Sequence, residues 1–243
     1  MTEIATVILV HGGWHDETCW DPLRAELDLR DIPSVAVRLP LIRLDTDAAV
    51  VRTTIEAQRG DVMVVAHSWG GGPVTLGASG LARVKHLIYL ASFMLEAGVP
   101  SIPLAQRRRV TAGQAAKTAA NNDEIAMDPS RARTTLYHDV DSELADRMIE
   151  RLRPIAVSCN QEIATHRVAA WRTVTTTYAV CLQDRAIAPE DQRAMARNAH
   201  EAVELDTGHS PFLARPDLVG DLIANRYHRI QPGIGNPMPT VRE

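Results

Sequence analysis

Short apolar runs recur along the chain, separated by segments in which apolar side chains have helical spacing. The first run, Ala5 to Val10, is nearly unbroken and rich in β-branched residues, which is typical of a strand covered on both faces. Similar runs predict strands over 34–39, 62–65, 84–91, 175–182 and 202–205. Helical spacing predicts helices over 20–29, 48–58, 71–79, 189–199 and 216–227. This alternation predicts an α/β fold with a doubly wound, mostly parallel sheet.

The alternation breaks between about 93 and 171, where we find no strand pattern. Helices are expected there over 111–120, 129–137 and 142–153. In the last of these, Leu144, Met148 and Leu152 lie four residues apart and form one apolar stripe, and Asp141 is the expected N-cap. We therefore expect a helical lid, inserted between two strands, over the edge of the sheet.

The composition fits one domain over residues 1–230, followed by a loose tail over 231–243 that is rich in Pro and Gly. The net charge of −4 is small, which gives no reason to expect nucleic acid as a partner. The three cysteines show no CxxC spacing, so we predict neither a disulfide framework nor a zinc site. Because the N-terminal residues resemble neither a signal peptide nor a membrane span, we expect a cytoplasmic protein with no membrane partner. The oligomeric state stays open.

The segment from Val62 to Pro73 reads VMVVAHSWGGGP and predicts a strand, a sharp turn at Ser68 and the start of a helix. Ala66 and Gly70, two residues before and after the serine, are small enough to pack against each other in such a turn. The turn would hold Ser68 in a strained conformation with its hydroxyl exposed. Small residues flank serines by chance, however, so a role for Ser68 depends on partners elsewhere in the chain.

Those partners are expected at the ends of other strands. A serine hydroxyl needs a neighbouring base to become a nucleophile, and the base needs an acid that fixes its tautomer. Asp184 follows the strand predicted to end at Leu182, and His209 follows the last predicted strand. Carboxyl ends of parallel strands share one edge, so Ser68, Asp184 and His209 are expected to meet there. Glu96, which also follows a strand, is the alternative acid.

With these residues in place, the chain resembles the α/β-hydrolase superfamily. The resemblance is to its small, lid-bearing branch, which contains plant methylesterases and salicylate-binding esterases, hydroxynitrile lyases and related bacterial esterases. It extends from Val7 to about Tyr227 and is loose in the lid. The segments that carry it are HGGWHDETCW (11–20), AHSWGGG (66–72), CLQDRAIAPEDQ (181–192) and TGHSPFLARP (207–216). Ala66 departs mildly from the glycine in the family pattern G-x-S-x-G.

The resemblance implies a role for each matching residue. Ser68 would be the nucleophile, His209 the base and Asp184 the acid that orients it. The backbone N–H groups of Gly13 and Trp69 would form the oxyanion hole, which stabilises charge that develops in the transition state. The substrate-pocket candidates are Trp14, Met94, Met127, Tyr137 and Trp171, and ordinary packing is an equally good interpretation of each.

Other polar residues near these motifs have structural interpretations. His11 is expected to brace the first glycine loop by hydrogen bonds, and His67 is expected to be a structural histidine. His11 and His15 are four residues apart but flank a glycine loop, which is a poor arrangement for a metal site. Asp206 lies close to His209 in sequence, but a structural role fits it better. We expect neither a metal nor an organic cofactor.

These assignments predict a serine esterase for small or medium esters or lactones, working through an acyl-enzyme. Two alternatives remain. One is a cofactor-free lyase of the hydroxynitrile-lyase type, although such plant lyases usually carry a lysine directly after the histidine, where this chain has Ser210. The other is a small-ligand receptor that keeps the fold, since a fold does not fix a function.

Overall fold

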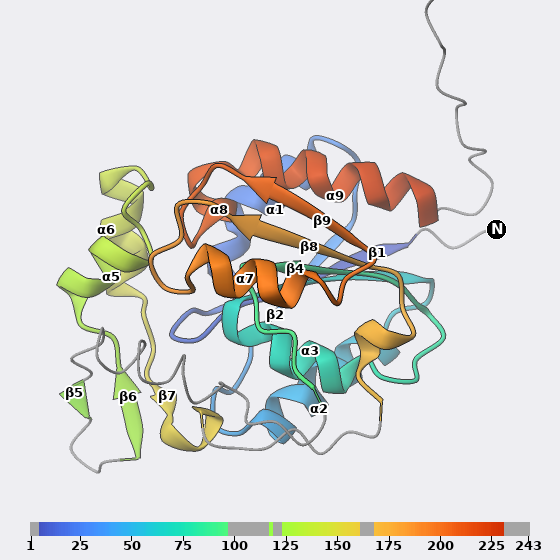
Figure 1. The fold of residues 1–243 in the computed structure, drawn as a ribbon, viewed down its shortest axis with the longest axis horizontal. Coiled ribbons are helices and arrows are strands. Elements are labelled where there is room, and N and C mark those ends of the chain that lie inside the picture. The colour runs from blue at the N-terminus through green and yellow to red at the C-terminus, as the bar shows by residue number, and fades with distance from the viewer. Residues whose placement is uncertain (1–4, 97–116, 119–122, 161–167, 231–243) are drawn as a thin grey trace, which may run out of the picture.

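The computed structural model describes residues 5–96, 117–118, 123–160 and 168–230. Six strands form the central sheet in the order β2-β1-β3-β4-β8-β9 (Figure 1). Their bounds are β1 Thr6–Val10, β2 Ser34–Val37, β3 Val62–His67, β4 Val84–Leu90, β8 Thr176–Cys181 and β9 Glu201–Leu205. Each pair of neighbouring strands is parallel, which confirms the predicted doubly wound α/β fold.

Helices cover both faces of this sheet. The first face carries α1 (Asp21–Asp28), α8 (Pro211–Ala214) and α9 (Pro216–Ile230), and the second carries α2 (Leu44–Glu56), α3 (Gly71–Gly77) and α7 (Pro189–Ala196) (Figure 1). Successive side chains of β1 alternate between the two cores, with Val7 and Leu9 in the first and Ile8 and Val10 in the second. All four are fully buried, which explains the unbroken apolar run.

Element boundaries differ from the predicted ones where apolar spacing gives no signal. α2 begins at Leu44, four residues before the predicted start, and its first turn contains Asp45 and Asp47, whose charges suit a helix N-terminus. α8 was not predicted. Four 3-10 turns complete the described part of the fold: η1 Glu17–Trp20, η2 Ser68–Gly70, η3 Val157–Asn160 and η4 Ala170–Arg172.

The segment between β4 and β8 contains strands as well as helices, so the expectation of no strand there is wrong. Two of the three predicted helices are present, as α5 (Pro129–Thr135) and α6 (Ser142–Glu150). Beside them lies a small antiparallel sheet of β5 (Lys117–Thr118), β6 (Glu124–Ala126) and β7 (Ile155–Ala156). Strands of two or three residues are too short to show a period of two in the sequence. β5 also replaces part of the helix predicted over 111–120, whose other residues lie outside the described ones.

This segment lies beyond the end of the main sheet to which the arrows of β8 and β9 point (Figure 1). Asp141 caps α6 as predicted, accepting hydrogen bonds from the backbone N–H groups of Glu143 and Leu144. Tyr137 and Ala145 are buried in the core of the first face, so the segment is packed onto the sheet domain. Its function as a lid stays a prediction, and the tail over 231–243 lies outside the described residues. No helix among those described is long and apolar enough to cross a membrane.

Candidate active site

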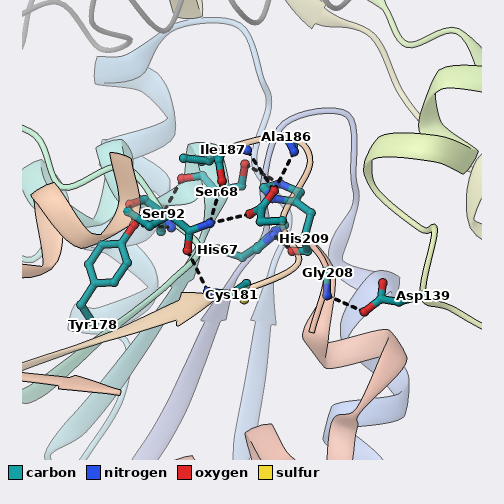
Figure 2. Close-up of polar contacts among 12 residues, drawn as sticks. His67, Ser68, Ser92, Asp139, Tyr178, Cys181, Ala186, Ile187, Gly208 and His209 are labelled. Carbon is teal, nitrogen blue, oxygen red and sulfur yellow. Dashed lines mark hydrogen bonds and ion pairs between the residues drawn. The ribbon is translucent and has the colours of Figure 1, made fainter. Parts of the chain in front are cut away.

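Ser68 stands at a strained turn between β3 and α3. Its φ of 49° lies in the left-handed region, which non-glycine residues rarely adopt. The backbone carbonyl of Ser68 accepts hydrogen bonds from Ser92 Oγ (2.8 Å) and from the backbone N–H of Phe93 (3.1 Å). The residues that follow β4 therefore hold the turn in place, as Figure 2 shows for Ser92.

Gly70 also lies very close to the backbone at the end of β1. A Cβ atom on Gly70 would lie 2.6 Å from the backbone oxygen of His11 and 2.7 Å from that of Val10. The nearest atoms thus belong to Val10, at the end of β1, and to His11, the next residue. The close approach of these two backbones excludes any side chain at position 70.

The structure brings Ser68, His209 and Asp184 together (Figure 2 shows Ser68 and His209). His209 Nε2 lies 3.1 Å from Ser68 Oγ, and His209 Nδ1 lies 2.7 Å from Asp184 Oδ2. A carboxylate only accepts, so Nδ1 carries the proton that faces Asp184 and Nε2 presents its lone pair to the serine hydroxyl. This arrangement can remove a proton from Ser68 Oγ.

The carboxylate of Asp184 is buried but fully hydrogen-bonded. Its Oδ1 accepts from the backbone N–H groups of Ala186 (2.7 Å) and Ile187 (2.9 Å). Its Oδ2 accepts from Gln192 Nε2 (2.8 Å) in addition to His209. The sequence analysis did not identify Gln192 as a partner of the acid. The one feature that could have indicated it is its place at the end of the 181–192 segment.

The alternative acid and the nearby Asp206 are engaged elsewhere. Glu96 forms an ion pair of 2.7 Å with Arg172 at the surface. Asp206 accepts a hydrogen bond from the side-chain amide of Gln183 (2.9 Å). Of these acidic residues, only Asp184 faces the ring of His209.

The first glycine loop lies against the serine. A Cβ atom on Gly12 would lie 2.8 Å from Ser68 Cβ, and one on Gly13 would lie 3.7 Å from Trp69 Cβ. The two residues predicted to form the oxyanion hole are therefore neighbours. The indole N–H of Trp69 donates to Asp47 Oδ2 (3.0 Å), a fully buried carboxylate that fixes this side chain.

His11 and His67 are both neutral, and their ring nitrogens form hydrogen bonds with backbone groups. His11 Nδ1 donates to the carbonyl of Gly12 (2.8 Å), and His11 Nε2 accepts from the backbone N–H of Leu39 (3.0 Å), so His11 braces the loop as expected. Burial lowers its pKa to about 3. His67 Nε2 donates to the backbone carbonyl of His209 (2.9 Å), and burial holds the pKa of His67 well below its ordinary value. Among the described residues, no group of three or more His, Cys, Asp or Glu side chains could hold a metal ion.

The pocket candidates lie around the loop and in both cores. The indole N–H of Trp14 donates to the carbonyl of Ile125 (3.0 Å), and that of Trp171 donates to the carbonyl of Leu95 (2.9 Å). The other three are Met94, buried in the second-face core; Met127, partly buried against the first-face core; and Tyr137, buried within that core. Their contribution to a substrate pocket stays a prediction.

Comparisons with known proteins identify the family of this chain. The family model described as "Alpha/beta hydrolase family" matches residues 7–222. An alpha/beta hydrolase of Aspergillus novofumigatus, nvfD, is 26% identical over 242 residues, which span 90% of this chain and 95% of that protein. Methylesterase 9 of Arabidopsis thaliana is 25% identical over 252 residues, spanning 90% of this chain and 98% of that protein.

A solved structure shows the same fold. The crystal structure of the methylesterase MES16 from Arabidopsis superposes with a TM-score of 0.77 at 20% sequence identity, covering 92% of this chain and 98% of that one. The resemblance found in the sequence is thereby confirmed at the level of the family. Because the family model spans residues 7–222, the chain belongs to the alpha/beta hydrolase family.

Proposed function

We propose that the protein is a serine hydrolase that cleaves small or medium carboxylic esters or lactones through an acyl-enzyme on Ser68. The observation that carries this proposal is the hydrogen-bonded chain from Ser68 Oγ through His209 to Asp184, with distances of 3.1 and 2.7 Å. The names of its relatives, a methylesterase and a hydrolase, support the same class of reaction.

In the proposed mechanism, His209 Nε2 takes the proton of Ser68 as Oγ attacks the ester carbonyl. Asp184 stabilises the imidazolium that forms. The backbone N–H groups of Gly13 and Trp69 donate to the carbonyl oxygen as it becomes negative, at roughly 3 kcal/mol each. His209 then protonates the leaving alcohol, and a water molecule, activated by the same histidine, releases the acid from Ser68.

A lyase reaction is less well supported. In the plant lyases that the sequence resembles, a lysine usually follows the histidine and holds the departing cyanide. Ser210 occupies that position here and is completely buried. It provides no positive charge for an anionic leaving group, so the hydrolase is the better interpretation.

The test combines turnover with labelling. The wild-type protein is expected to hydrolyse a panel of p-nitrophenyl esters, lactones and methyl aryl esters and to react covalently with a fluorophosphonate at Ser68. Ser68→Ala should abolish both while circular dichroism shows an unchanged fold. Ser79→Ala, which removes a surface hydroxyl bonded to the carbonyl of Val168, is the matched control. A wild-type protein that is neither labelled nor active, but binds a small ligand, would favour the receptor instead.

A further inference from the structure

The turn between α5 and α6, residues 136–140, contacts two loops of the proposed active site. Tyr137 is almost completely buried, and its hydroxyl lies 2.8 Å from His15 Nε2. Two residues later, the carboxylate of Asp139 accepts a hydrogen bond from the backbone N–H of Gly208, directly before His209 (Figure 2). One short turn therefore contacts both the glycine loop over 12–15 and the loop that carries the base.

The first contact reaches the predicted oxyanion hole. His15 Nδ1 lies 3.0 Å from the carbonyl of Gly13, which only accepts, so Nδ1 carries the proton. His15 Nε2 is then the acceptor, and the hydroxyl of Tyr137 must donate to it. Burial lowers the pKa of His15 to about 4 and raises that of Tyr137, so this hydrogen-bonding pattern persists across the neutral range.

The hydrogen bonds from Tyr137 through His15 to Gly13 act on the peptide units beside the predicted oxyanion hole. His11 holds the carbonyl of Gly12, which belongs to the same peptide unit as the N–H of Gly13. His15 holds the carbonyl of Gly13, in the next peptide unit. The peptide planes on both sides of the Gly13 Cα are therefore fixed by imidazoles, and the second imidazole is fixed by Tyr137. Glycine is the residue most in need of such fixing, since it has the largest conformational freedom.

The second contact is equally close. A Cβ atom on Gly208 would lie 2.6 Å from His138 Cε1 and closer still to Asp139 Oδ1, so the turn packs directly on this backbone. On the other side, the carbonyl of His209 accepts from His67 Nε2 (2.9 Å). The backbone of the base is thus held between Asp139 and His67.

We propose that the 136–140 turn is a positioning element of the reaction, in which Tyr137 orients the oxyanion loop through His15 and Asp139 orients the base through Gly208. The proposal rests on the function proposed above. It also gives the hydroxyl of Tyr137 a role in addition to the predicted one of lining a substrate pocket, because that hydroxyl donates to His15.

The test uses variants that remove one contact each. Tyr137→Phe deletes the donor to His15, and Asp139→Ala deletes the acceptor for Gly208. Asp139→Asn keeps a neutral acceptor and should restore part of the loss. Tyr227→Phe is the matched control for the tyrosine, since its hydroxyl bonds the carbonyl of Ala5, in the residue before β1. Asp146→Ala is the control for the aspartate, since it only removes a surface pair with Arg133.

For Tyr137→Phe and Asp139→Ala, we expect kcat to fall by about tenfold or more with KM within about twofold, because the reacting groups are misplaced and binding is kept. Affinity for a trifluoromethyl ketone, which forms a tetrahedral adduct on the serine, should fall in parallel with kcat. Both controls should keep kcat within about twofold.

The outcomes separate this inference from the proposed function. The positioning role is wrong if the wild-type protein hydrolyses esters but both test variants keep the kcat of their controls. It is also wrong if the variants differ from their controls only by a higher KM. If the wild-type protein neither turns over esters nor reacts with a fluorophosphonate, the proposed function itself fails. Asp139 is exposed, so Asp139→Ala tests the idea even if Tyr137→Phe were to fold poorly.

Discussion

Gln192 Nε2 donates a hydrogen bond of 2.8 Å to Asp184 Oδ2, the same oxygen that accepts from His209 Nδ1. Gln192 is completely buried, and the rest of its amide is also engaged. Nε2 donates to the carbonyl of Ile187 (2.8 Å), and Oε1 accepts from the backbone N–H of Cys181 (2.9 Å). One side chain on α7 therefore connects the end of β8 to the acid of the proposed triad.

Replacing this amide should impair both stability and catalysis. Gln192→Leu would remove the hydrogen-bond partner of the Cys181 N–H and of the Ile187 carbonyl, and it would remove one donor from Asp184. Each buried polar group left unsatisfied costs roughly 1–3 kcal/mol. We expect a lower unfolding midpoint in urea and a fall in kcat/KM of about tenfold or more. Gln183→Leu, at an exposed amide bonded to Asp206, is the control and should change kcat/KM by less than about twofold.

The two candidate acids can be separated by isosteric amides. Asp184→Asn keeps the shape of the side chain but can present an N–H to His209, which stabilises the wrong tautomer. We expect kcat to fall by roughly 10³- to 10⁴-fold. Glu96→Gln breaks only a surface pair with Arg172, so kcat should stay near the wild-type value. Ester turnover of the two purified variants decides the matter, and the reverse ranking would make Glu96 the acid.

Sequence reasoning succeeded where a strong local pattern was present. In β1, β3 and β8, every or nearly every side chain is buried, and each of these strands is an apolar run with β-branched residues. Such runs are visible without knowledge of the partners. The shared edge of a parallel sheet then placed Ser68, Asp184 and His209 near one another before any distance was known.

The same reasoning failed where contacts are distant in sequence or elements are short. Tyr137 and His15 are 122 positions apart, and neither lies in a pattern that indicates their hydrogen bond. Gln192 occupies an ordinary helical position on α7. β5, β6 and β7 have two or three residues each, and each of them is a strand only because it pairs with a neighbour in the small sheet. Strand-end position also could not separate Asp184 from Glu96, because both follow a strand of the same sheet.

Gly12 should tolerate no side chain. A Cβ atom there would lie 2.8 Å from Ser68 Cβ and 2.9 Å from His67 Nδ1, so Gly12→Ala must displace the serine or the glycine loop. We expect a loss of kcat of roughly 100-fold and a destabilisation of about 1–3 kcal/mol. Gly13→Ala meets its nearest atom, Ile155 Cδ1, at an ordinary 3.4 Å and should lose much less activity. Equal losses in the two variants would contradict the steric argument.

Buried histidines predict an acid-sensitive fold. Burial lowers the pKa of His11 to about 3 and those of His15 and His86 to about 4, against 6.5 in the unfolded chain. Well above pH 6.5 these histidines are neutral in both the folded and the unfolded chain, so they add no pH dependence to the stability. Between pH 6.5 and about 4, the unfolded chain binds protons that the folded chain does not, so the free energy of unfolding falls as the pH is lowered.

His86 allows this to be tested away from the proposed active site. It lies on β4, and its Nε2 bonds Thr177 Oγ1 (2.9 Å). A pKa lowered from 6.5 to about 4 corresponds to a loss of roughly 3 kcal/mol by the acid end of that window. His86→Gln keeps a hydrogen-bonding group for Thr177 but binds no proton in either state. Urea unfolding measured from pH 4 to pH 8 should therefore show a shallower fall for His86→Gln than for the wild-type protein, by about one proton, with the two curves parallel above pH 7. A curve for the variant that runs parallel to the wild type throughout would mean that folding does not lower the pKa of His86.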